Sequence, residues 1–129
     1  MTNTTPPEDR MQALARALQQ FADARDWGPF HSPKNLASAL VVEAGELLEH
    51  FQWLTEDQSR QLAPGAKQAV AHEMADVLLY LVQLSTVLDI DLLDAAHAKM
   101  ALNAQSTPWS RRAATAANTT RCEGGAAPP

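Results

Sequence analysis

The sequence contains two pairs of acidic residues, and each pair lies within an otherwise largely apolar segment. The two members of a pair are three positions apart. Glu43 and Glu46 form the first pair, and Glu73 and Asp76 form the second. Residues three apart lie on adjoining parts of one helical face, so each pair projects two carboxylates together if its segment is a helix. Antiparallel packing of the two helices would gather all four, and like charges at that spacing repel unless a cation neutralises them. Mg²⁺ prefers hard oxygen ligands and keeps waters for phosphates, so the spacing predicts a magnesium site.

Spacing alone leaves two interpretations of these acids open: ligands of one cation, or solvated residues on polar helix faces. Other metal chemistries fit less well. The Glu-x-x-His motif of ferritin-like di-iron sites is absent, because Glu49 and Asp76 are the residues that stand three positions after Glu46 and Glu73. The zinc motif His-Glu-x-x-His begins at His72 but is incomplete, because Asp76 stands where the second His is needed.

Helical periodicity surrounds both acidic pairs. Ser32 and Pro33 have the residue types of an N-cap and a first helical position. We expect helices from Pro6-Pro7-Glu8-Asp9 to about Arg25-Asp26, from 33 to about 52, from 66 to 88 and from 91 to 104, with a polar segment at 55–63. Residues 77–84 are apolar nearly all round, which is typical of a helix buried on most sides. The fold class is therefore all-α, a four-helix-bundle-like arrangement completed by dimerisation.

The charge is acidic overall and unevenly spread. The 129 residues contain 10 Lys and Arg against 15 Asp and Glu, a net charge of −5. Residues 105–129 hold three arginines against one glutamate, +2, so residues 1–104 hold −7. An acidic surface speaks against binding of nucleic-acid polymers, which need a basic one. Cys122 is the single cysteine, so the chain has no internal disulfide, and no Ser or Cys stands in a recognisable nucleophile setting.

The length suits one domain between two polar ends. We expect a flexible N-terminus at 1–7, a helical domain at 8–108 and a disordered tail rich in Ala, Thr and Arg at 109–129. No signal pattern is visible and no apolar run approaches the ~20 residues of a membrane span. The expectation is a cytoplasmic protein without a membrane partner.

Six segments, in order, resemble the MazG-like nucleotide pyrophosphohydrolases, and most closely their dCTP pyrophosphatase branch. The segments are RDW at 25–27, FHSPKNL at 30–36, EAGEL at 43–47, FQW at 51–53, EMADVLLY at 73–80 and KMALN at 99–103. The resemblance implies a homodimer or homotetramer that hydrolyses a (deoxy)nucleoside triphosphate, such as dCTP or a modified dCTP, to the monophosphate and pyrophosphate. It also implies that the four acids bind Mg²⁺ at a site built from more than one subunit.

The resemblance assigns substrate contacts as well. The residues it implies are Trp27, Trp53 and Tyr80 around the nucleotide and Lys99 and Asn103 at the phosphates. We also expect His31 and the basic residue Lys34 to contact the substrate. Aromatic faces near an acidic metal site also suit base stacking, at ~1–3 kcal/mol per base. Which carboxylate acts as the base is open, with Glu46 the first candidate.

Two positions depart from the family pattern. Leu18 stands where the dCTP branch has a His that reads the base, and residues 104–108 lack the basic residue and Tyr that commonly precede the Pro. Base and sugar preference, the number of metal ions and the choice between dimer and tetramer are therefore left open. Two alternatives remain: a noncatalytic helical module that binds a nucleotide or a protein, and an enzyme for another pyrophosphate-containing metabolite.

Overall fold

Helices are the regular structure of the chain. The computed structural model describes residues 9–106, in which no strand is present. The elements are α1 (Arg10–Asp23), the 3-10 helix η1 (Gly28–Phe30), α2 (Pro33–Glu49), α3 (Glu56–Arg60), α4 (Pro64–Val87) and α5 (Leu92–Ser106). The all-α prediction is confirmed. The flexible N-terminus expected at 1–7 and the disordered tail expected at 109–129 lie outside the described residues. The chain separates into two compact units, Met1–Ile90 and Asp91–Pro129.

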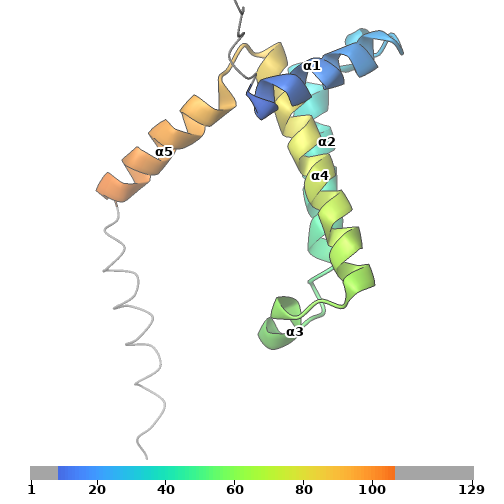
Figure 1. The fold of residues 1–129 in the computed structure, drawn as a ribbon, viewed down its shortest axis with the longest axis vertical. Coiled ribbons are helices and arrows are strands. Elements are labelled where there is room, and N and C mark those ends of the chain that lie inside the picture. The colour runs from blue at the N-terminus through green and yellow to red at the C-terminus, as the bar shows by residue number, and fades with distance from the viewer. Residues whose placement is uncertain (1–8, 107–129) are drawn as a thin grey trace, which may run out of the picture. The chain divides into compact units, whose positions relative to one another are not determined.

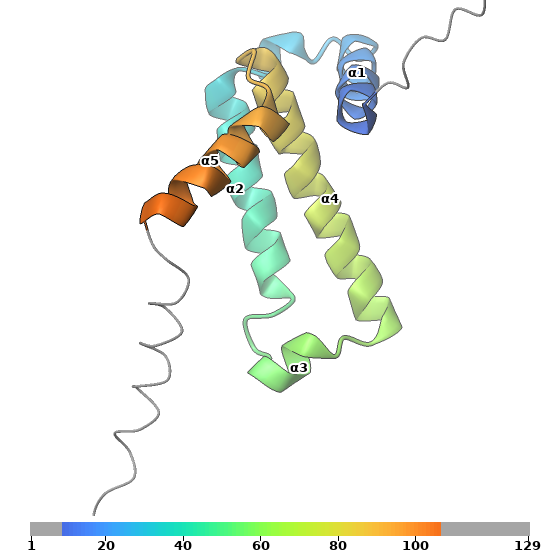
Figure 2. The same cartoon turned by 60° about the vertical axis from the view of Figure 1, so that its left-hand side comes forward.

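Helices α2 and α4 form an antiparallel pair in the first unit, and they lie side by side in Figures 1 and 2. Glu43 on α2 lies opposite Asp76, whereas His50, at the end of α2, lies beside the earlier residue Glu73. Residue numbers therefore rise along one helix as they fall along the other. This pairing joins the two acidic segments, which are far apart in sequence.

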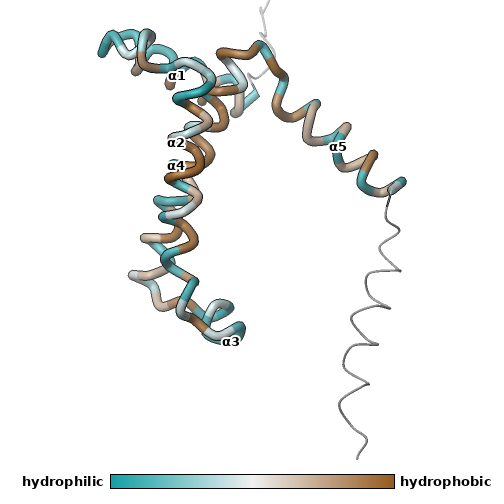
Figure 3. The backbone as a smooth tube through the Cα atoms, turned by 180° about the vertical axis from the view of Figure 1, so that it is seen from behind, coloured by the Kyte–Doolittle hydropathy of each residue, from teal (hydrophilic) through white to brown (hydrophobic). Residues whose placement is uncertain are grey.

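The core of the pair is small. Leu36 on α2 and Val82 on α4 are each 1% exposed, and Val70 and Ala22 are also buried. Figure 3 shows hydrophobic residues along the upper parts of α2 and α4, whereas α3 is mostly hydrophilic. Because an aliphatic side chain contributes ~1.5–3 kcal/mol when fully buried, Leu36 and Val82 help fix which faces of the helices meet.

Local hydrogen bonds fix the entry into α2. Ser32 is the N-cap, and its Oγ accepts a hydrogen bond from the backbone N–H of Asn35 at 3.2 Å. Pro33 occupies the first turn, where its missing N–H costs nothing. The Asn35 side chain donates to the carbonyl oxygen of Phe30 at 3.0 Å, so α2 is joined directly to η1.

A left-handed residue reverses the chain after α1. Asp26 has φ 53°, a region that Asp tolerates better than most residues. The reversal lets the N–H of Trp27 donate to the carbonyl oxygen of Ala22 at 3.1 Å. Helix α1 itself packs on α4, with Ala22 buried. Trp27 is thereby held close to the end of α1.

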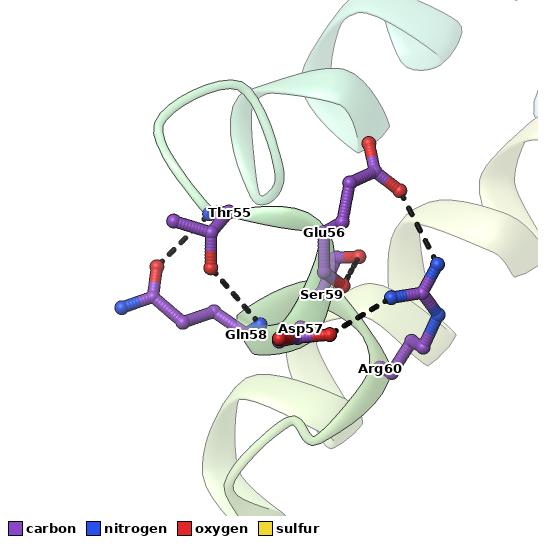
Figure 4. A network of polar contacts seen from close by, with 6 residues as sticks. All are labelled: Thr55, Glu56, Asp57, Gln58, Ser59 and Arg60. Atoms are coloured by element: carbon purple, nitrogen blue, oxygen red, sulfur yellow. Dashed lines mark hydrogen bonds and ion pairs between the residues drawn. The ribbon is translucent and has the colours of Figure 1, made fainter. Parts of the chain in front are cut away.

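The expected polar segment at 55–63 contains the short helix α3. Thr55 and Gln58 form a capping box, in which each side chain bonds the other residue's backbone N–H. The guanidinium of Arg60 forms ion pairs with both acids of the helix: Nη2 lies 3.6 Å from Glu56 Oε2, and Nη1 lies 3.1 Å from Asp57 Oδ1 (Figure 4). These contacts are local, so five residues suffice for a helix here.

Helix α5 belongs to the second unit. Its first turn is capped by Asp91, whose Oδ1 accepts from the N–H of Asp94 at 2.9 Å. Lys99 and Asn103 are exposed and lie four residues apart, hence on one face of the helix. Among the helices of the described part of the chain, none is both long and apolar enough to cross a membrane.

Candidate functional site

Three of the four predicted carboxylates come together between α2 and α4. Glu43, Glu73 and Asp76 each offer an oxygen atom, and these atoms all lie within 4.8 Å of one another. Glu43 and Glu73 are half-buried and Asp76 is exposed. Each helix supplies its acids at the i, i+3 spacing, and the antiparallel pairing supplies the convergence. The geometry matches the predicted arrangement for these three residues.

The electrostatics of this cluster favour a cation. Burial raises the pKa of Glu43 above its ordinary value, and the neighbouring carboxylates of Glu46, Asp76 and Glu73 raise it further. Glu73 Oε2 is buried and has no hydrogen-bond partner within residues 9–106. A buried carboxylate oxygen normally has a partner, and a hard divalent cation is one that an oxygen-only donor set suits. The residues present therefore fit Mg²⁺.

Glu46 lies beside this cluster rather than within it. It is exposed on α2, and its carboxyl group is near enough to that of Glu43 to raise the pKa of Glu43. It does not join the three residues whose oxygen atoms converge. One predicted ligand is thus placed next to the candidate metal position, with its side chain open to water.

His50 also borders the cluster, although it is not one of the predicted site residues. Its Nε2 lies 3.8 Å from Glu73 Oε1. His50 also lines a cavity of about 530 Å³ that the end of α2 shares with α3 and the start of α4. The sequence holds one signal for it, because His50 follows Glu46 by four residues and so shares its helical face.

An aromatic pocket of about 150 Å³ adjoins the carboxylates. The predicted substrate residues Trp27, His31 and Tyr80 line it, and so does Asp76 from the acidic cluster. The other lining residues are Leu18, Phe21, Leu79 and Gln83. Asp76 therefore belongs to both features, and the carboxylate cluster and the aromatic pocket are neighbours.

Ring contacts hold Trp27 in place. Phe21 meets it edge-on, with ring centroids 5.5 Å apart, and His31 does the same at 5.8 Å. The guanidinium of Arg25 lies 3.4 Å from the centroid of the Phe21 ring. Such aromatic contacts stabilise by about 0.5–1.5 kcal/mol each. Trp27 is nevertheless 40% exposed, so part of its side chain stays accessible where it lines the pocket.

Two of the remaining predicted residues, Trp53 and Lys34, do not line this pocket. Trp53 follows α2 at the end far from Trp27 and is 86% exposed. Lys34 is exposed in the first turn of α2. Lys99 and Asn103 lie on α5, in the second unit. Their substrate contacts stay predictions.

Four lining residues of the pocket were not predicted as site residues. On α4 the lining residues are Asp76, Leu79, Tyr80 and Gln83, at the i, i+3, i+4, i+7 spacing of one helical face. Extending the helical face that Asp76 and Tyr80 share would have identified Leu79 and Gln83 from the sequence. Leu18 and Phe21 come from α1, and no spacing rule connects α1 to α4.

Comparison with known proteins places the chain among relatives. A family model described as MazG-like matches residues 39–118, which include both acidic pairs. The chain is 42% identical to dCTP pyrophosphatase 1 of Mus musculus and 40% identical to that of Homo sapiens, in each case over 104 residues and 79% of this chain. It spans 61% of the length of these relatives. A crystal structure of a pyrophosphatase from Archaeoglobus fulgidus superimposes with a TM-score of 0.76 at 36% identity, covering 82% of this chain and 99% of that one.

Proposed function

The chain belongs to the MazG-like family, and from that premise we propose that it is a Mg²⁺-dependent nucleoside triphosphate pyrophosphohydrolase. Its substrate would be a (deoxy)nucleoside triphosphate, with dCTP or a modified dCTP as the first candidates. One observation supports this most directly: Asp76 is shared by the carboxylate cluster and the aromatic pocket. A base in the pocket therefore has its phosphates beside the candidate metal position.

Glu43, Glu73 and Asp76 are the residues that would hold the metal. Bound Mg²⁺ would neutralise charge on the phosphate oxygens and lower the pKa of the attacking water. Without a cation the same three carboxylates repel a triphosphate. The acidic cluster thus makes binding of substrate depend on binding of metal.

Glu46 is suited to accept the proton of the attacking water. Its carboxyl group lies beside Glu43, outside the converging trio, and is open to water. The oxygen of that water forms a bond to the α-phosphorus, and the bond from the α-phosphorus to the bridging oxygen breaks. Pyrophosphate leaves, and the nucleoside monophosphate keeps the base. General-base assistance of this kind contributes about 10²–10⁴-fold.

The aromatic pocket orients the nucleotide. Trp27 and Tyr80 offer aromatic faces to a base, and His31 supports Trp27 through an edge contact. A stacked base contributes about 1–3 kcal/mol. This binding energy is available at a distance from the reacting phosphorus, where it can hold the α-phosphate in place.

A second copy of the chain would complete the site. Few side chains within residues 9–106 are buried, while many large apolar ones stay exposed on the paired helices. Those on α2 and α4 are Val41, Val42, Leu48, Met74, Leu78 and Val87. Exposed apolar faces of this kind favour a homodimer or homotetramer. Trp53, Lys99 and Asn103 would then contribute from whichever subunit brings them near the nucleotide.

The experiment is an assay of pyrophosphate release by the full-length chain, with a panel of ribo- and deoxyribonucleoside triphosphates and Mg²⁺. We expect release from at least one of them. Glu46→Gln and Asp76→Asn should each abolish it while circular dichroism shows unchanged helical content. Glu49→Gln is the matched control, because Glu49 is exposed on α2 three residues after Glu46 and is no part of the converging cluster.

Each other outcome has a defined meaning. Full activity in both variants would remove the metal-site hypothesis. Binding of a nucleotide without any pyrophosphate release would support the noncatalytic module instead. Release from another pyrophosphate-containing metabolite, and from no nucleoside triphosphate, would move the enzyme to a different substrate class.

A further inference from the structure

Gln83 is a half-buried amide in the apolar half of α4. It lines the aromatic pocket with Trp27 and Tyr80, and also a neighbouring cavity of about 190 Å³ between α1 and the end of α4. Its side chain makes no hydrogen bond to any of residues 9–106. Because Gln83 is only half-buried, water reaches its amide in the free chain, and a ligand that fills the pocket would have to replace that water as a hydrogen-bond partner.

The position of Gln83 along α4 suits the far end of a nucleoside. Asp76 and Gln83 are seven residues apart, two turns of one helical face and about 10 Å along the axis. Tyr80 lies between them. With the α-phosphate beside Asp76 and the base against Trp27 and Tyr80, the outer edge of the base would point toward Gln83.

The other polar groups of the pocket are less suited to reading that edge. A Trp offers one donor, and the two nitrogens of a neutral His lie on different sides of its ring. Leu18, which faces the same pocket from α1, offers no polar atom. The Gln amide presents a donor and an acceptor side by side, the arrangement that makes bidentate contacts with base edges elsewhere.

We propose that Gln83 reads the base edge, and that the pocket accepts 4-amino and 4-oxo pyrimidines alike. This inference rests on the proposed function. A cavity of about 150 Å³ holds a single six-membered ring such as benzene, which favours a pyrimidine over a purine. Cytosine offers a donor at its 4-amino group and an acceptor at N3, whereas uracil offers an acceptor at O4 and a donor at N3–H. The amide matches both because it can turn its two ends.

Binding to uncleavable nucleotides tests this separately from catalysis. The ligands are the α,β-methylene analogues of dCTP and dUTP, measured by isothermal titration calorimetry with the full chain and Mg²⁺. We expect the dissociation constants of the two analogues to agree within about tenfold, which is the difference that a single hydrogen bond makes. Gln83→Met, which keeps length and shape but loses both polar atoms, should weaken each about tenfold or more. Gln83→Glu keeps a hydrogen-bond acceptor but loses the donor, so its affinity for each analogue should lie between that of the parent chain and that of Gln83→Met.

Two controls separate base reading from a structural role. Inorganic tripolyphosphate has no base, so Gln83→Met should bind it like the parent chain. Gln19→Met removes an amide that also borders the 190 Å³ cavity but already donates to Asp23 at 2.8 Å, and it should leave both nucleotide affinities unchanged.

Unchanged nucleotide affinities in Gln83→Met would overturn the role of Gln83. A preference above about 100-fold between the two analogues in the parent chain would overturn the dual reading, since the amide serves both edges. Equal loss of tripolyphosphate binding would assign Gln83 to folding instead. If no triphosphate is hydrolysed but the analogues bind in a Gln83-dependent way, the proposed function fails and this inference stands.

Discussion

Two groups of acids in this chain are built in opposite ways. On α3, Glu56 and Asp57 stand in the first turn of a helix and both face Arg60, so each negative charge has a positive neighbour (Figure 4). Between α2 and α4, by contrast, carboxylates converge on one another, and Glu73 Oε2 has no hydrogen-bond partner among the described residues. The acids of α3 stabilise their own helix. Those of α2 and α4 have one another as neighbours, and together with burial this raises the pKa of Glu43.

Two glutamines differ in the same way. Gln58 completes the capping box of α3, with its side chain and its backbone N–H both bonded to Thr55. Gln83 lines a pocket with no protein partner in the part of the chain that the structure describes. Polar groups that satisfy each other locally contribute to stability, whereas those left unpaired in a concave place are candidates for binding a ligand.

Among the changes that test the contrast between these two groups of acids, the largest effect is expected at Glu73. Glu73→Gln should lower pyrophosphate release about 100-fold or more, since loss even of outer-shell partners costs metal sites 10–100-fold. It should also remove most of the thermal stabilisation by Mg²⁺, which reaches about 2.7 kcal/mol at 100 times the dissociation constant. Differential scanning fluorimetry with and without Mg²⁺ measures the second effect. Glu56→Gln is the matched control, and an equal response of both variants would erase the contrast between the two groups.

A middle-sized effect is expected at Thr55. Thr55→Ala removes the cap of α3 and should cost about 1 kcal/mol of unfolding free energy, the usual value of an N-cap. Pyrophosphate release per folded molecule should stay unchanged, because α3 contributes to neither the carboxylate cluster nor the aromatic pocket. Chemical denaturation followed by circular dichroism measures the loss. A large fall in turnover at unchanged stability would show that α3 takes part in the reaction.

The smallest effect is expected at Glu43, and it has the opposite sign. Burial and the neighbouring acids raise the pKa of Glu43, so its charged form is disfavoured in the folded chain at neutral pH. Glu43→Gln should therefore stabilise the metal-free protein, by no more than about 0.5 kcal/mol because solvent screens the cluster. Thermal unfolding in EDTA at pH 7 checks this. A lower midpoint in the variant would mean that the cluster is not strained without metal.

Local signals in the sequence predicted much of the fold. Ser32 and Pro33 begin α2 as their residue types indicate, and α4 begins and ends within two residues of the expected positions. Helix α3 is less visible in the sequence, because five residues are too few to show a hydrophobic period. Within the candidate site, the pairing of Glu43 with Glu73 and Asp76 follows from i, i+3 spacing and antiparallel packing. The exclusion of Glu46 from the converging trio does not.

By itself the sequence determined the helices, their caps and the two acidic pairs, because each depends on residues a few positions apart. Only the tertiary structure decided which faces meet. Burial of Leu36 and Val82 helps fix how α2 lies against α4, and that packing brings together residues such as Glu43 and Asp76, which are 33 positions apart in the sequence. It places Asp76 in both the acidic cluster and the aromatic pocket, and Gln83 two turns away on the same wall. Packing between distant segments, which no local spacing encodes, turned two acidic motifs into one candidate site.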